Sequence, residues 1–206
     1  MFKRRDPRSY VQLVGEMFYP RGGWRRASQY IMHRMRRLPD QPSRIARGFA
    51  CGVFISFTPF FGFHFIGAAA LAWLIRGNIL AALLGTFVGN PLTTPFMALS
   101  SLTCGRWLLG AGGQVSMKHL PMEFARATGE LWHNLTSIFT GAEMHWSHLH
   151  GFYSEIFFPY AVGSIIPGTI AGVAFYYVTL PLIRAWHEMR AKKMAARIAQ
   201  IRDAQR

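Results

Sequence analysis

The heptapeptide SFTPFFG, residues 56–62, lies near the middle of a run of 28 residues, 48–75, that contains no Asp, Glu, Lys or Arg. An uncharged run of this length predicts a membrane-embedded helix, because about 20 apolar residues suffice to cross the hydrocarbon core. Proline and glycine, however, interrupt helices. The fold therefore depends on why a helix-breaking segment lies at the centre of an apolar run.

Two further uncharged runs have the same design. Residues 77–105 and 156–183 are 29 and 28 residues long, and each of the three runs contains a proline and is followed by an arginine. A straight helix of 28 residues would be about 42 Å long, which exceeds the hydrocarbon core of about 30 Å. The prolines (Pro59, Pro91, Pro167) precede the arginines (Arg76, Arg106, Arg184) by 17, 15 and 17 residues. This spacing predicts three copies of one unit, a short apolar half, a break and a longer apolar half; the alternative is that Gly and Pro are simply common in membrane helices.

The positive charge is confined to the two ends of the chain. The net charge is +14, with 12 Lys/Arg and 3 Asp/Glu in residues 1–47, and 7 Lys/Arg and 2 Asp/Glu in residues 184–206. Residues 48–183 have four of each sign. Because Lys and Arg favour the cytoplasmic side, both ends are expected there. An even number of crossings follows, so we expect at least one run to be re-entrant.

The breaks carry helix-capping chemistry. Thr58-Pro59 and Asn90-Pro91 each pair a good N-cap residue with proline at the first helical position. Helix N-termini at mid-depth would present free N–H groups to an anionic substrate, as in transporters with broken helices. The alternative is that the breaks only let helices pack and that their caps are satisfied internally. The candidate substrate-binding residues are Thr58, Pro59, Gly62, His64, Asn90, Pro91, Thr93 and Thr94.

Other chemical motifs are weak. His64 is the only histidine or charged residue in the three runs, which makes it a functional candidate or a neutral imidazole bonded to a backbone carbonyl. The segment EMHWSHLH, residues 143–150, has enough ligands for a metal but lacks the His-Glu-x-x-His order, so we expect an interfacial rim and no metal. No phosphate loop, nucleophile elbow or carboxylate pair occurs. We therefore expect no enzyme and no cofactor.

Amphipathic segments flank the runs. At 100° per residue, residues 24–38 place an apolar stripe (Trp24, Ala27, Ile31, Met35, Leu38) opposite five arginines (Arg25, Arg26, Arg34, Arg36, Arg37). This pattern predicts a helix in the headgroup layer of an anionic leaflet, with Trp24, Arg25, Arg26, Arg36 and Arg37 at the membrane surface. The apolar stripe argues against nucleic acid as the partner. In the connector 106–155, one apolar face (Phe124, Ala127, Leu131, Leu135, Ile138) predicts a helix on the bilayer or over the core.

Four short motifs resemble a known family. They are Gly52-Val53-Phe54, Pro59-Phe60-Phe61-Gly62, Arg76-Gly77-Asn78 and Asn90-Pro91-Leu92-Thr93-Thr94-Pro95. They resemble the bacterial membrane proteins grouped as domain of unknown function 2062, over about residues 44–183. The resemblance implies an integral protein of the bacterial inner membrane and no established activity. A looser likeness to the DedA-type lipid translocases rests on architecture alone, and the acidic-and-arginine signature expected in that family is missing.

The sequence thus predicts an all-α polytopic membrane protein. Its parts are a basic amphipathic arm (1–47), a membrane domain (48–183, with the connector 106–155) and a basic C-terminal helix (184–206) that is cytoplasmic like the N-terminus. The expected function is a transporter or translocase for an anionic substrate, with lipid phosphate as one candidate. The alternative is a non-transporting scaffold or envelope-assembly factor. Expected partners are the phospholipid bilayer and anionic lipids at its cytoplasmic face, with a homo-oligomer left open.

Overall fold

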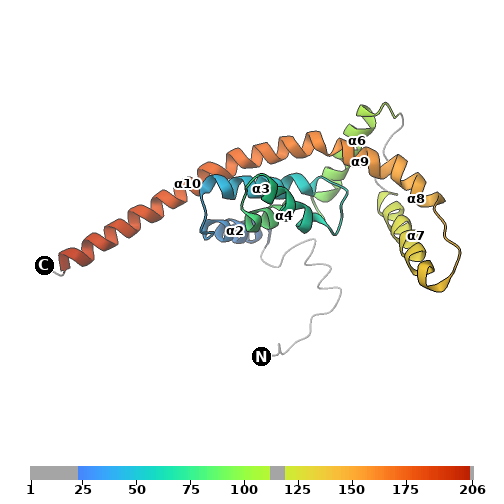
Figure 1. Cartoon of the computed structure of the whole chain (residues 1–206). Helices are drawn as coiled ribbons and strands as arrows, with labels where there is room; N and C mark the ends of the chain where they lie inside the picture. Colours follow the sequence, from blue (N-terminus) through green and yellow to red (C-terminus); the bar gives the residue numbers. More distant parts are fainter. Residues whose placement is uncertain (1–22, 112–118, 205–206) are drawn as a thin grey trace.

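The computed structural model describes residues 23–111 and 119–204, whose regular elements are all helices. Figure 1 shows the long helix α10 (Ile165–Ala204) running along the molecule, with α2, α3 and α4 beside its middle. Helices α7 and α8 lie at the end opposite to the C-terminus, and the last part of α10 projects beyond the other helices. The all-α class predicted from the sequence is confirmed for the described residues.

The first uncharged run folds as a hairpin of two short helices. Helix α3 (Pro42–Ser56) begins with proline in its first turn, where the missing N–H costs nothing, and α4 (His64–Leu74) returns beside it. The segment SFTPFFG forms the turn between them, with Gly62 at a φ of +85°. The helix-breaking residues thus reverse the chain at the centre of the run.

The second run is also broken. Asn78 caps the short helix α5 (Ile79–Gly85), its Oδ1 accepting the Ala81 N–H at 2.8 Å, and a 3-10 turn η1 (Thr86–Val88) follows. After residues 89–93 the chain continues as α6 (Thr94–Leu108). The break predicted at Asn90-Pro91 therefore lies between two helical pieces.

The third run, residues 156–183, is nearly continuous. It is preceded by α7 (Leu120–Thr140) and α8 (Ser147–Phe152). It begins within a π-helical turn η2 (Tyr153–Phe157) and continues through α9 (Phe158–Gly163) into α10. Only Ser164 separates α9 from α10, and Pro167 lies in the first turn of α10. In the first run, residues 48–56 of α3 precede the break and the 11 residues of α4 follow it, so the short half comes before the longer one there. The repetition of one unit stays a prediction.

A seam of small residues joins α3 to α5. A Cβ atom on Gly48 would meet the backbone of Asn78, and one on Gly52 would meet Ala82 and Gly85. Because the contacts advance together along both helices, α3 and α5 run in the same direction. Close backbone approach through small residues is typical of helices packed in membranes, where burial from water contributes little.

The main hydrophobic core lies where α3 meets α10 and α2 (Gly23–Arg36). Its buried members are Met35, Ile45, Phe49, Val53, Ala81 and Ile183. Gly172 contacts Ala50, while Gly168, four residues earlier, contacts Phe54, so α10 runs antiparallel to α3. The core therefore holds α10 against α3 and the α2 arm, with Ala81 of α5 at its edge.

The apolar stripe of α2 faces the protein. Met35 is 2% exposed and lies in the core, and Ile31 and Leu38 pack against it. The protein therefore covers the C-terminal part of the stripe, and the placement of α2 in the headgroup layer stays a prediction. Of the predicted surface residues, Arg25, Arg26 and Arg37 are exposed, and Arg36 lies over the Trp186 ring at 4.8 Å. The side chain of Trp24 lies outside the described residues.

Helix α7 leaves most of its predicted apolar face uncovered. Phe124 packs against residues of α6 and α9 and Ala127 is buried, but Leu131, Leu135 and Ile138 are 53%, 49% and 63% exposed. The helix therefore covers the core only with its first turns.

One continuous helical stretch, residues 147–203, is long and apolar enough to cross a membrane among the described residues. Helices His64–Leu74 and Ile79–Val88 are apolar but shorter. Several crossings, as predicted from the three runs, remain a prediction.

Candidate anion-binding site

The second break is closed by its own side chains. Asn90 Oδ1 accepts the N–H groups of Leu92 at 3.0 Å and Thr93 at 3.2 Å, and Thr93 Oγ1 accepts the Asn90 N–H at 3.0 Å. Asn90 thus closes the turn 91–93 ahead of α6, whose first residue is Thr94 and whose N-cap position is Thr93, so Pro91 does not occupy the predicted first helical position. Since these N–H groups already have partners, they are not available to an anion, and the internally satisfied alternative holds here.

The first break corrects the prediction at Thr58-Pro59. Helix α4 begins at His64, five residues after Pro59, and Thr58 does not cap it. Instead Thr58 Oγ1 donates to the Ile55 carbonyl at 2.7 Å, at the end of α3. Proline at 59 is followed by a turn rather than a helix, because Gly62 takes a left-handed conformation two residues before α4.

The remaining predicted residues, His64, Pro91 and Thr94, do not share one site. His64 Nε2 donates to the Thr58 carbonyl at 3.1 Å, which matches the alternative of a ring bonded to a backbone carbonyl and holds the turn closed. Thr94, by contrast, lines an apolar groove of about 820 Å³ with Phe61, Phe124 and Trp132. Pro91 is exposed beside the Asn90 cap. The two breaks do lie together, since Ser56 Oγ donates to the Thr86 carbonyl at 3.2 Å.

Three arginines line a cavity near the first residues of α3 and α5, at the end of these helices away from the two breaks. A cavity of about 580 Å³ is lined by Arg44 and Arg47 of α3, by Arg76 after α4, and by Trp73. Arg44 Nε and an amino group of Arg47 both donate to the Arg76 carbonyl, at 3.4 and 3.2 Å. We call this cavity the arginine pocket. Guanidinium groups in such a cluster match the geometry of phosphate and carboxylate oxygens.

Arg76 is held in an unusual backbone conformation. Its φ is +54°, in the left-handed region that favours glycine. The Gly77 N–H donates to the Ala72 carbonyl at 2.7 Å and the Arg76 N–H to the Trp73 carbonyl at 3.2 Å, the two bonds of a Schellman helix end. Non-glycine residues in this position cost stability, and such strain often accompanies function.

An acidic residue organises the edge of the arginine pocket. Asp40 pairs with Arg44 at 3.3 Å and accepts a hydrogen bond from Asn78 Nδ2 at 3.0 Å. Burial alone would raise the pKa of Asp40, but hydrogen bonds from Asn78 and the Gln41 N–H, with the charges of Arg44 and Arg47, lower it overall. Asp40 thus stays ionised and ties the start of α3 to the start of α5.

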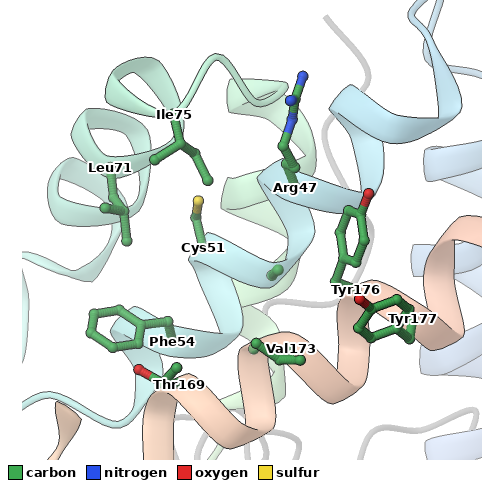
Figure 2. Close-up of a pocket in the computed structure, with 11 residues that line it drawn as sticks. Arg47, Cys51, Phe54, Leu71, Ile75, Thr169, Val173, Tyr176 and Tyr177 are labelled. Carbon is green, nitrogen blue, oxygen red and sulfur yellow. The ribbon is translucent and has the colours of Figure 1, made fainter.

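An apolar groove adjoins the arginine pocket. It has a volume of about 310 Å³ and lies between α3, α4 and α10. Figure 2 shows Arg47 at one end, with Cys51 and Phe54 following along α3, Leu71 and Ile75 on α4, and Val173 on α10. Arg47 lines both cavities.

Sequence reasoning missed this pocket. Arg44 and Arg47 are three residues apart just before the first uncharged run, and Arg76 directly follows it. In a helical hairpin these positions meet at one end, so the flanking arginines themselves were the available signal. From the sequence, Arg76 marked the end of a unit and belonged to a family motif, whereas Arg44 and Arg47 counted only toward the charge of residues 1–47.

The histidine segment does not gather around one point. His133 Nε2 donates to the Glu143 carbonyl at 3.2 Å, and His148 lies 3.5 Å from Glu123. Within residues 23–111 and 119–204, no three His, Cys, Asp or Glu side chains are arranged to hold a metal ion.

The chain matches one protein family by its sequence. A model of one family, described as an uncharacterized protein conserved in bacteria (DUF2062), matches residues 25–192. No curated protein and no solved structure matches the chain. The matched range includes both breaks and the three arginines of the pocket.

Proposed function

The chain belongs to the bacterial DUF2062 family of uncharacterized proteins, and from its geometry we propose an integral inner-membrane protein that transports or translocates an anionic substrate bound first at the arginine pocket. The proposal places the anion at the beginning of α3 rather than at the two breaks. The reason is that the N–H groups that follow Asn90 already have internal partners.

The charge distribution supports a membrane placement. Residues Ile165 to Ile183 of α10 span about 28 Å, close to the thickness of the hydrocarbon core. Arg184 and the arginine pocket lie at one end of this segment, while Arg106 donates to the Glu155 carbonyl near the other. Arginines at both edges of an apolar layer are typical of membrane proteins.

Helix lengths support a re-entrant hairpin. Helices α3 and α4 have 15 and 11 residues, about 22 and 16 Å, so neither crosses the core and both begin or end beside the arginine pocket. Helices α5 and α6 together would make one broken crossing, and α9 with α10 the return. This arrangement has two crossings and leaves both termini on the cytoplasmic side, as the charges predict.

The observation that carries the proposal is the meeting of Arg44, Arg47 and Arg76 in one pocket. Ion pairs in the described part of the chain offset this charge only through Asp40 and Arg44. Three arginines with one nearby carboxylate leave the pocket with a net positive charge, which attracts an anion strongly where water is scarce.

The test is a lipid and metabolite profile of a deletion strain, complemented with wild type, Arg47→Gln or the matched control Arg190→Gln. Arg190 is exposed on α10 and lines neither cavity. We expect at least one anionic compound to change severalfold on deletion and to be restored by wild type and Arg190→Gln. Arg47→Gln should fail to restore it at normal protein abundance. Full restoration by Arg47→Gln would contradict the proposal.

One observation favours the scaffold alternative. The uncovered side of α7, with Leu131, Leu135 and Ile138, is a surface that another membrane protein could cover. A deletion strain with an unchanged profile, combined with loss of an envelope assembly, would support that function instead.

A further inference from the structure

We infer that the anion in the arginine pocket is the headgroup phosphate of an anionic phospholipid, one acyl chain of which lies in the groove between α3, α4 and α10. The inference rests on the proposed function and names its substrate class.

The two cavities form one amphiphilic site. The arginine pocket is lined by Arg44, Arg47, Arg76 and Trp73, whereas the adjoining groove is lined almost wholly by apolar atoms. Arg47 belongs to both, so a ligand touching both has its charge at Arg47 and its apolar part beyond it. A free phosphate or a small carboxylate would leave the groove unused.

Figure 2 shows the direction such a ligand would take. The Arg47 guanidinium points to the end of the groove near the α4–α5 connection, and Cys51 and Phe54 follow on the same side of α3. Seven residues separate Arg47 from Phe54, which gives the apolar part a length of about 10 Å along α3. Tyr176 and Tyr177 of α10 flank the Arg47 end, a position that suits aromatic side chains at a membrane–water interface.

Arg47 still has a donor to satisfy. One amino group donates to the Arg76 carbonyl, but the buried Nε has no hydrogen-bond partner among the described residues. A buried donor without a partner is costly, and a turn of the Arg47 side chain toward the pocket would let a phosphate oxygen satisfy it with a charge-assisted bond.

Charge selects among lipids. Asp40 pairs with Arg44, and neither Arg47 nor Arg76 has a carboxylate within ion-pair distance in the described ranges. A zwitterionic headgroup would bring its own cation to this cluster. An anionic headgroup such as that of phosphatidylglycerol would not, so it should bind more tightly.

The experiment is native mass spectrometry of the full chain in detergent with added phosphatidylglycerol, phosphatidylcholine or glycerol phosphate. Val173→Trp fills the groove from the exposed side of α10, and Val178→Trp is its control, because Val178 is 57% exposed and lines neither cavity. Arg47→Gln removes the shared cation, and Arg190→Gln, at an exposed position of α10 that lines neither cavity, is its control. Thermal melting of each variant checks that it is folded.

We expect phosphatidylglycerol to be retained at least fivefold more than phosphatidylcholine, and Val173→Trp and Arg47→Gln each to reduce this at least fivefold while both controls do not. If Arg47→Gln abolishes binding and Val173→Trp has no effect, or if glycerol phosphate competes as well as the lipid, the pocket binds an anion without a chain. In that case this inference fails and the proposed function stands. If neither variant changes binding, both fail.

Discussion

Asn90 and Thr93 cap each other across the second break: the Asn90 N–H donates to Thr93 Oγ1 at 3.0 Å, and the Thr93 N–H donates to Asn90 Oδ1 at 3.2 Å. This is the reciprocal pattern of a capping box, with Asn and Thr in its two positions. Thr93 Oγ1 also donates to the Val88 carbonyl, at the end of η1. The pair therefore joins the two helical pieces of this run through its own polar groups.

Removing either member of this pair should destabilise the fold by a similar amount. We expect Thr93→Val and Asn90→Ala each to cost about 1 kcal/mol, the usual value for a lost cap, and the double variant to cost less than their sum. Thermal unfolding in detergent measures this, with Thr103→Val, exposed on α6, as control.

Asn90→Asp keeps the hydrogen-bond acceptor and should complement a deletion strain fully. Inactivation of this variant at normal protein abundance would return the anion site to the break.

Replacing Arg76 with glycine should separate stability from binding. Because Arg76 has a φ of +54°, Arg76→Gly should leave the melting temperature unchanged or raise it, relieving up to about 1–2 kcal/mol of backbone strain. Phosphatidylglycerol retention should nevertheless fall. The reverse change, Gly141→Ala at the left-handed end of α7 (φ +70°), should lower the melting temperature. A large loss of stability in Arg76→Gly would argue against strain at this position.

The Asp40 carboxylate predicts a pH dependence of stability. Its folded-state pKa lies below the ordinary value of 3.8, so its contribution is fully present above that value and is lost as pH falls through the lowered pKa. The wild type should therefore melt higher than Asp40→Asn at pH 6, and the difference should shrink toward pH 3. A constant difference across this range would exclude the ionised carboxylate as the source.

The seam between α3 and α5 predicts a sharp glycine dependence. Gly52→Ala should strongly lower the yield of monodisperse protein and its melting temperature, because the added Cβ meets the backbone of Ala82 and Gly85. Gly129→Ala on α7 is the matched control, since nothing lies near its Cβ position, and it should be neutral or stabilising by up to about 1 kcal/mol. Equal effects would mean that helix propensity, and not packing, decides both.

The proposed two crossings predict where labels are reached. A reporter active only outside the cytoplasm should be silent when fused after Arg206. In a chain without Cys51 and Cys104, a cysteine at exposed Ala142 should react with an impermeant thiol reagent added to intact spheroplasts, and one at Arg26 should not. Labelling at both positions, or at neither, would contradict this topology.

Much of the local structure could be read from the residues. The uncharged runs, their interruption near Pro59 and Pro91, and the cap at Asn90 follow from backbone rules that act over a few residues. At Thr58 the same rules failed, because a Thr-Pro pair also suits a turn, and the left-handed Gly62 selected the turn. Local chemistry allowed both outcomes there.

The direction of the α2 stripe was beyond sequence reasoning for another reason. An amphipathic face can be buried against lipid or against protein, since lipid tails are as apolar as leucine. Met35, in the last turn of α2, is 2% exposed, which shows that the protein covers this end of the stripe. The pattern of residues is the same in either case.

The sequence by itself determined that the chain is helical, that its apolar runs are interrupted, and that its charge lies at the ends, because each depends on neighbouring residues or on composition. Only the tertiary structure decided that Arg47 and Arg76, 29 residues apart, share one pocket and one hydrogen bond. That depends on α4 returning along α3 and ending level with its first turns, and a meeting of distant residues has no local signature. The arginines were visible as separate charges, and the packing of two short helices made them a site.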